Sequence, residues 1–108
     1  MFVKKRENGV VLIRDGIRKQ NLVHGKKTQM VKFFLEKGKS IPIHAHIHEQ
    51  TGYMISGKMV LSVDSKEHTV NPGDSWCIPG KTPHSAKMIE NCVVVEVFSP
   101  VRKDYIEE

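Results

Sequence analysis

Short apolar runs recur along the chain, and glycine or polar residues separate them. None of these stretches repeats with the 3.6-residue period of an amphipathic helix. Short apolar runs bounded by turn residues are typical of β-strands. They predict strands at residues 10–13, 30–35, 41–47, 53–55, 59–63, 75–78 and 92–98.

The residues between the runs are typical of turns. Ser56-Gly57 separates two apolar runs and predicts a tight hairpin, because glycine adopts a positive φ without steric cost. In Asn71-Pro72-Gly73, proline presets φ and glycine takes the strained corner. Many short strands with such turns predict an all-β sandwich or barrel. The chain has no linker or internal repeat, so we expect one domain over residues 1–108.

Composition adds limits on compartment and partners. With 39% hydrophobic and 27% charged residues, the chain reads as globular and soluble. No apolar run approaches the roughly 20 residues that span a bilayer. The charged N-terminus also lacks the apolar region of a signal peptide. We therefore expect a cytoplasmic protein without a membrane partner.

The net charge of +5 bears on the ligand. Lysines and arginines are spread along the chain and form no basic helix or basic-aromatic motif, so we expect no nucleic-acid partner. A positive cleft attracts small anions. The charge therefore favours a small anionic molecule as the ligand.

Histidines gather at alternate positions in residues 41–53. On a strand, His44 and His46 project to the same side, roughly 7 Å apart, and can reach one ion. Alone, this pair fits a metal site or the polar face of an ordinary strand. His48 falls in the following turn, where it lies either at a pocket mouth or in solvent.

Two spaced motifs change the balance. The first motif, G-x5-H-x-H-x3-E-x6-G, matches Gly38, His44, His46, Gln50 and Gly57. The second motif, G-x5-P-x-G-x2-H, matches Gly73, Pro79 and His84. Gln50 stands where the first motif has Glu, and Lys81 replaces the middle glycine of the second.

Together the motifs resemble the cupin superfamily over residues 28–98. The resemblance implies a small jelly-roll β-barrel in which three histidines and a carboxylate surround a metal. The implied ligands here are His44, His46, Gln50 and His84, and the implied cofactor is a divalent transition metal such as Mn, Fe, Ni or Zn.

Glu96 interrupts the apolar run at 92–98, where an unpaired buried carboxylate would be costly. By alternation Val94, Glu96 and Phe98 share one face, and Val93, Val95 and Val97 share the other. If the second set fills the core, Glu96 either meets solvent or points into the pocket. Arg102 pairs with Glu96 or with a ligand carboxylate, unless it forms a surface salt bridge.

Three stretches, "HEQTGYMISG", "GDSWCIPGKTPHSA" and "VFSPVRKDY", resemble the small KdgF-type cupins of pectin and uronate degradation. Those proteins open the ring of 4,5-unsaturated monouronates, and in them a Gln completes the metal site. An Asp, a Phe and an Arg line their active site. The matching positions here are Glu96, Phe98 and Arg102, with Glu one methylene longer than Asp.

Three classes of function remain open at this point. The first is a metal-dependent lyase- or isomerase-like enzyme acting on a small anionic sugar acid. The second is a metal-dependent dioxygenase, and the third is a cupin that binds or senses a small molecule without turnover.

We also expect a homodimer, with N-terminal strands in residues 9–23 packing on a partner, because the core is small and sheet edges need covering. The two cysteines, Cys77 and Cys92, are expected to be small buried residues.

Overall fold

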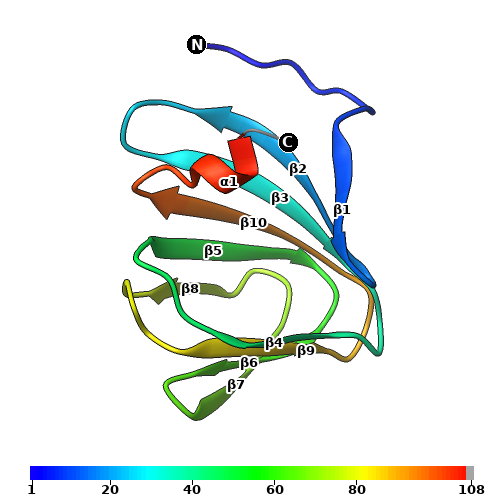
Figure 1. Cartoon of the computed structure of the whole chain (residues 1–108). Coiled ribbons are helices and arrows are strands. Elements are labelled where there is room, and N and C mark those ends of the chain that lie inside the picture. Colours follow the sequence, from blue (N-terminus) through cyan, green and yellow to red (C-terminus); the bar gives the residue numbers. More distant parts are fainter. Residues whose placement is uncertain (107–108) are drawn as a thin grey trace.

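The computed structural model describes residues 1–106, which are mostly β-strand. The strands are β1 (Val10–Arg14), β2 (Ile17–His24), β3 (Gln29–Leu35), β4 (Ser40–His44), β5 (Glu49–Ser56), β6 (Met59–Val63), β7 (Lys66–Val70), β8 (Ser75–Ile78), β9 (His84–Met88) and β10 (Cys92–Ser99). One short helix, α1 (Lys103–Ile106), follows the last strand (Figure 1). Within the described residues, no helix is long and apolar enough to cross a membrane.

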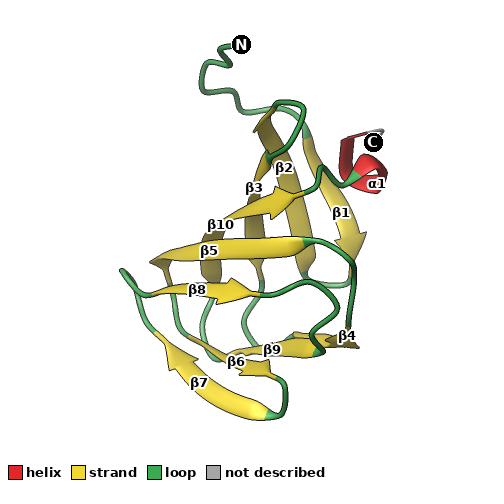
Figure 2. Ribbon diagram, turned by 90° about the vertical axis from the view of Figure 1, so that its left-hand side faces the viewer, coloured by secondary structure: helices red, strands yellow, loops and turns green. Residues whose placement is uncertain are grey.

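The strands form two antiparallel sheets. One has six strands in the order β1-β2-β3-β10-β5-β8, and the other has four in the order β4-β9-β6-β7. Figure 2 shows the four-stranded sheet lying across one side of the six-stranded sheet. The all-β, jelly-roll prediction is therefore confirmed. The described strands do not close into one hydrogen-bonded barrel; they pair within two separate sheets.

Most apolar runs fall within strands. β6 and β8 have the predicted bounds, and β10 extends the predicted run by Ser99. β4 ends at His44, before the predicted end at residue 47, and β5 begins at Glu49, before the predicted start at residue 53. β1 and β2 lie in the N-terminal range 9–23, except that β2 ends at His24. β7 and β9 were not predicted, because their segments, KEHTV and HSAKM, contain no apolar run.

The predicted hairpin at Ser56-Gly57 is wrong. β5 belongs to the six-stranded sheet and β6 to the four-stranded sheet, so the turn carries the chain from one sheet to the other. Gly57 has φ +95°, and a Cβ there would lie 2.1 Å from the backbone oxygen of Asn91. Glycine is needed both for this φ and for the close passage of the two chain segments.

The core lies between the two sheets, and β10 contributes one face to it. Val94 and Phe98 are almost fully buried, at 1% and 2% exposed. Val93, Val95 and Val97 are half-buried on the opposite face, so they do not fill the core as the first alternative supposed. Glu96 therefore shares the inner face with Val94 and Phe98.

Candidate metal centre and its cavity

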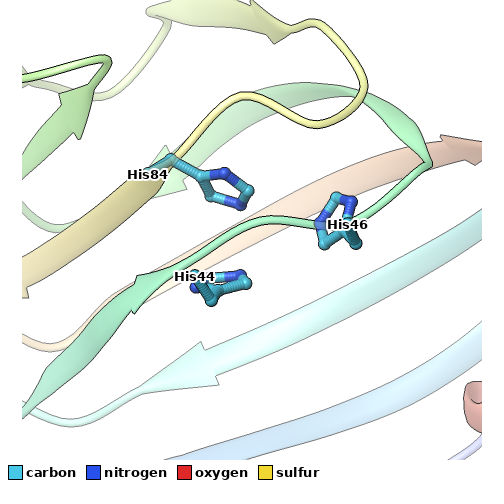
Figure 3. Close-up of side chains that lie close together, drawn as sticks. All are labelled: His44, His46 and His84. Atoms are coloured by element: carbon cyan, nitrogen blue, oxygen red, sulfur yellow. The ribbon is translucent and has the colours of Figure 1, made fainter.

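Three histidines approach one another where β4 and β9 meet. His44 ends β4 and His84 begins β9, and the two residues are direct partners in the register of the strands. His46 does not continue the strand as the alternation supposed; it lies in the loop between β4 and β5. The rings face a common space (Figure 3), and one ligand atom from each lies within 4.8 Å of the others. Nitrogens that share one ion at about 2.0–2.1 Å lie somewhat closer together than this, so a small inward movement of the rings would bring them around a metal.

Backbone carbonyls orient all three rings. Each ring places Nδ1 against a carbonyl oxygen two residues away: Pro42 for His44 (2.9 Å), His48 for His46 (3.0 Å) and Thr82 for His84 (2.8 Å). A carbonyl only accepts hydrogen bonds, so Nδ1 carries the proton and Nε2 keeps its lone pair. Within the part of the chain that the structure describes, Nε2 of His46 and of His84 is buried without a hydrogen-bond partner. Metal-binding histidines are typically held in this way.

Gln50 supplies a third buried, unpartnered atom among the described residues of the site. Its side chain is 5% exposed, and its amide Nε2 donates a hydrogen bond to Oε2 of Glu96. Oε1 of Gln50 is buried and has no partner. Because the nitrogen is engaged by Glu96, the oxygen is the end of the amide available as a ligand.

The surroundings of the inner histidines favour their neutral form. Burial lowers the pKa of His46, and the positive charge of Arg102 adds to this effect. Burial is also the main reason that the pKa of His84 is lowered. Neutral imidazole is the form that binds a metal. The residues fit a divalent transition ion, because orphaned imidazole nitrogens and an amide oxygen form a suitable ligand set.

A cavity of about 460 Å³ opens beside these residues, between the two sheets. It is lined by His44, Gln50 and His84, and also by Glu96, Phe98 and Arg102. The three residues predicted for catalysis therefore share a cavity with predicted metal ligands. Its volume lies within the range usual for small-molecule sites.

Glu96 lies in the wall of this cavity. Burial raises the pKa of its carboxyl to about 7, although hydrogen bonds from Gln50 and Trp76 and the charge of Arg102 act in the opposite direction. A carboxyl that titrates near neutral pH can both accept and release a proton.

Arg102 forms its ion pair with Asp104 and not with Glu96. Its Nη2 donates to Oδ2 of Asp104 at 3.0 Å. Its guanidinium carbon lies 3.8 Å from the ring centroid of Tyr105 and 5.1 Å from that of Phe98. The Nε atom of Arg102 is buried without a partner. The side chain is therefore held by stacking and an ion pair, while one donor remains available to a ligand.

The profile of the family described as Cupin domain matches residues 31–98, which is more than half of the chain. The chain belongs to the cupin family. It is 26% identical over 94 residues to the pectin degradation protein KdgF of Dickeya dadantii, with 85% of this chain and 86% of that protein covered. A 53-residue stretch is 38% identical to quercetin 2,3-dioxygenase of Bacillus subtilis, which covers 48% of this chain and 16% of the dioxygenase.

Solved structures agree with this assignment. KdgF from Halomonas sp. superposes on this cupin with a TM-score of 0.90 and 26% identity, covering 96% of both chains. An RmlC-like cupin from Shewanella frigidimarina gives a TM-score of 0.91 and 28% identity, covering 96% of this chain and 94% of the other. The chain is thus a KdgF-like cupin.

Several residues that hold Arg102 in this cupin were not predicted from the sequence. The backbone N–H of Arg102 donates to Oε1 of Gln29 (2.8 Å), which is 1% exposed. Lys19 is fully buried, and its Nζ donates to the backbone oxygen of Tyr105 (2.9 Å). Asn21 donates to the same oxygen. Lys19 lies two positions after buried Ile17 on a strand, so the alternation in IRKQ was an available signal.

The remaining residues singled out in the sequence have mixed outcomes. His48 lies in the turn before β5, as expected, with its ring 5.3 Å from that of His46. Burial lowers the pKa of His48, and its Nδ1 is buried without a partner. Cys92 is buried as predicted, but the prediction for Cys77 is wrong because that residue is exposed.

Proposed function

We propose that this cupin holds a divalent transition metal through His44, His46, Gln50 and His84, and that it opens the ring of an unsaturated uronate. The observation that carries the proposal is the set of buried, unpartnered atoms, Nε2 of His46 and His84 and Oε1 of Gln50, beside a cavity. The likeness to KdgF, whose name refers to pectin degradation, supports the substrate class.

Conversion of a 4,5-unsaturated uronate to a linear keto acid is an isomerisation. The anomeric hydroxyl loses its proton as the ring carbon–oxygen bond breaks, and the resulting enolate gains a proton on carbon to become a ketone. The reaction needs proton transfer but no oxidant. When bound, the metal supplies Lewis-acid polarisation of a ring or hydroxyl oxygen.

The residues around the cavity then have distinct roles. Nε of Arg102, which has no partner among residues 1–106, donates to the substrate carboxylate. Glu96, with its pKa near neutrality, moves the proton. Phe98 is 2% exposed and forms a rigid wall against which the substrate is placed.

A dioxygenase is the second candidate, and the 38% identity to quercetin 2,3-dioxygenase over 53 residues favours it. A binding or sensing cupin is the third. The deciding experiment incubates metal-analysed protein with 4,5-unsaturated galacturonate, with and without O2, and follows the loss of the conjugated double bond by ultraviolet absorbance. Oxygen-independent turnover is expected. Dependence on O2, with O2 consumed, would replace the proposal with the second candidate, and binding without turnover would replace it with the third.

A further inference from the structure

Three residues form a row across adjacent strands of the six-stranded sheet. Glu96 on β10 is the register partner of Gly52 on β5, and Gly52 is the register partner of Trp76 on β8. Directly opposed residues project to the same face of a sheet, with Cβ atoms about 4.5–5.5 Å apart. The row faces the cavity, because both Glu96 and Trp76 line it.

Gly52 leaves the space that the Trp76 indole occupies. A Cβ at Gly52 would lie 2.1 Å from Cε2 and 2.3 Å from Nε1 of the indole. The overlap is with the body of the ring, so a side chain at this position requires the indole to move. The indole thus lies across β5, between β8 and Glu96.

The indole reaches Glu96 from this position. The indole acts on the Glu96 carboxyl in the same sense as the hydrogen bond from Gln50: both lower its pKa against the effect of burial. Trp76 also lines a second, smaller cavity, together with Leu61, His68 and Cys77. The residue therefore borders both cavities.

We propose that Gly52 and Trp76 are positioning residues for Glu96: the indole N–H holds the carboxylate toward Gln50 and the metal ligands, and Gly52 provides the room for it. The effect on turnover rests on the proposed function. The effect on the metal site rests only on the proposed ligands and not on the proposed reaction, because Glu96 orients Gln50, and outer partners of metal ligands typically contribute about 10- to 100-fold in affinity.

Trp76 is the one tryptophan of the chain, so its indole gives a single N–H signal in a ¹⁵N–¹H NMR spectrum. In the wild type we expect this proton to exchange slowly with water. Glu96→Gln should shift the signal, because the acceptor changes from a carboxyl to a neutral amide. Gly52→Ala should shift it and accelerate exchange. If neither variant changes the signal, the indole does not contact Glu96 and the proposal is wrong.

Function is then measured on two variants, Gly52→Ala and Trp76→Phe, the second of which keeps an aromatic ring without the N–H. Both should weaken Mn²⁺ binding by about 10-fold. Both should also lower kcat on the uronate by about 10-fold or more while KM changes little. Gly25→Ala is the matched control, because a Cβ at Gly25 meets nothing within 4 Å; it should leave both quantities unchanged.

The outcomes separate this inference from the proposed function. Unchanged Mn²⁺ affinity and unchanged kcat in Trp76→Phe would overturn the positioning role, even if Gly52→Ala failed to fold. Weakened Mn²⁺ binding in these variants, together with a wild type that does not turn over the uronate, would support the positioning role and reject the proposed reaction.

Discussion

Gln50 donates its amide N–H to Glu96, and this contact determines which end of the amide faces the histidines. A glutamate at position 50 would instead place two carboxylates in contact, and like charges at that distance resist joint ionisation. The pair therefore explains why an amide stands where the cupin motif has a carboxylate. The carboxyl group of this site belongs to Glu96, which contacts Gln50, and not to residue 50 itself.

The first prediction exchanges the two groups. Gln50→Glu alone should lower turnover by more than about 100-fold, because the carboxylate pair then shares a proton. Adding Glu96→Gln restores one amide and one carboxylate, so the double variant should bind Mn²⁺ at least as tightly as the wild type but remain inactive. A coupling of roughly 0.5–3 kcal/mol between the sites is expected in metal affinity, measured by chelator competition. Additive effects would contradict direct pairing.

The second prediction concerns the metal ligands. His84→Ala should reduce Mn²⁺ affinity by more than the roughly 10- to 100-fold that follows loss of an outer partner. The measurement is metal content by elemental analysis after dialysis. His68→Ala is the matched control, because His68 is exposed on β7. This variant should retain the metal. Full metal content in His84→Ala would exclude His84 as a ligand.

The third prediction separates catalysis from folding at Glu96. Glu96→Gln preserves shape and hydrogen-bonding capacity but removes the titrating group. Turnover of the uronate should fall by about 100- to 10,000-fold, with metal content and thermal midpoint close to wild type. Turnover within a few-fold of wild type would remove Glu96 from the mechanism.

The fourth prediction tests how Arg102 is held. Lys19→Met removes a donor from the backbone oxygen of Tyr105, the residue on which the guanidinium stacks. Urea denaturation should show a loss of about 1–3 kcal/mol in the free energy of unfolding. KM for the uronate should also rise, as it should in Arg102→Lys, which loses the planar fork. Lys66→Met, at an exposed position on β7, should change neither quantity.

The fifth prediction is the homodimer. The outer face of the six-stranded sheet exposes Met30, Tyr53 and Ile55 beside the half-buried valines of β10. We expect light scattering at micromolar concentration to give a dimer mass, and Ile55→Lys to give a monomer. Ile89→Lys, at a similarly exposed isoleucine between β9 and β10, should remain dimeric. A monomeric wild type would refute this prediction.

Local signals in the sequence were enough for much of the fold. Alternation along a strand and the backbone preferences of glycine and proline act over a few residues, so β6 and β8 could be located from the chain alone. Alternation likewise placed Glu96 on one face with Phe98. It did not say which face was the core, because burial depends on the second sheet.

The sequence by itself determined the all-β class, the spaced histidines and the cupin motifs, because each is a pattern among near neighbours. Only the tertiary structure decided that Gln50 pairs with Glu96, 46 residues away, and that Lys19 supports Tyr105, 86 residues away. It also decided that Gly57 joins two sheets and that Gly52 makes room for Trp76. These relationships depend on which strands become neighbours, and strand pairing is set by the packing of the whole chain.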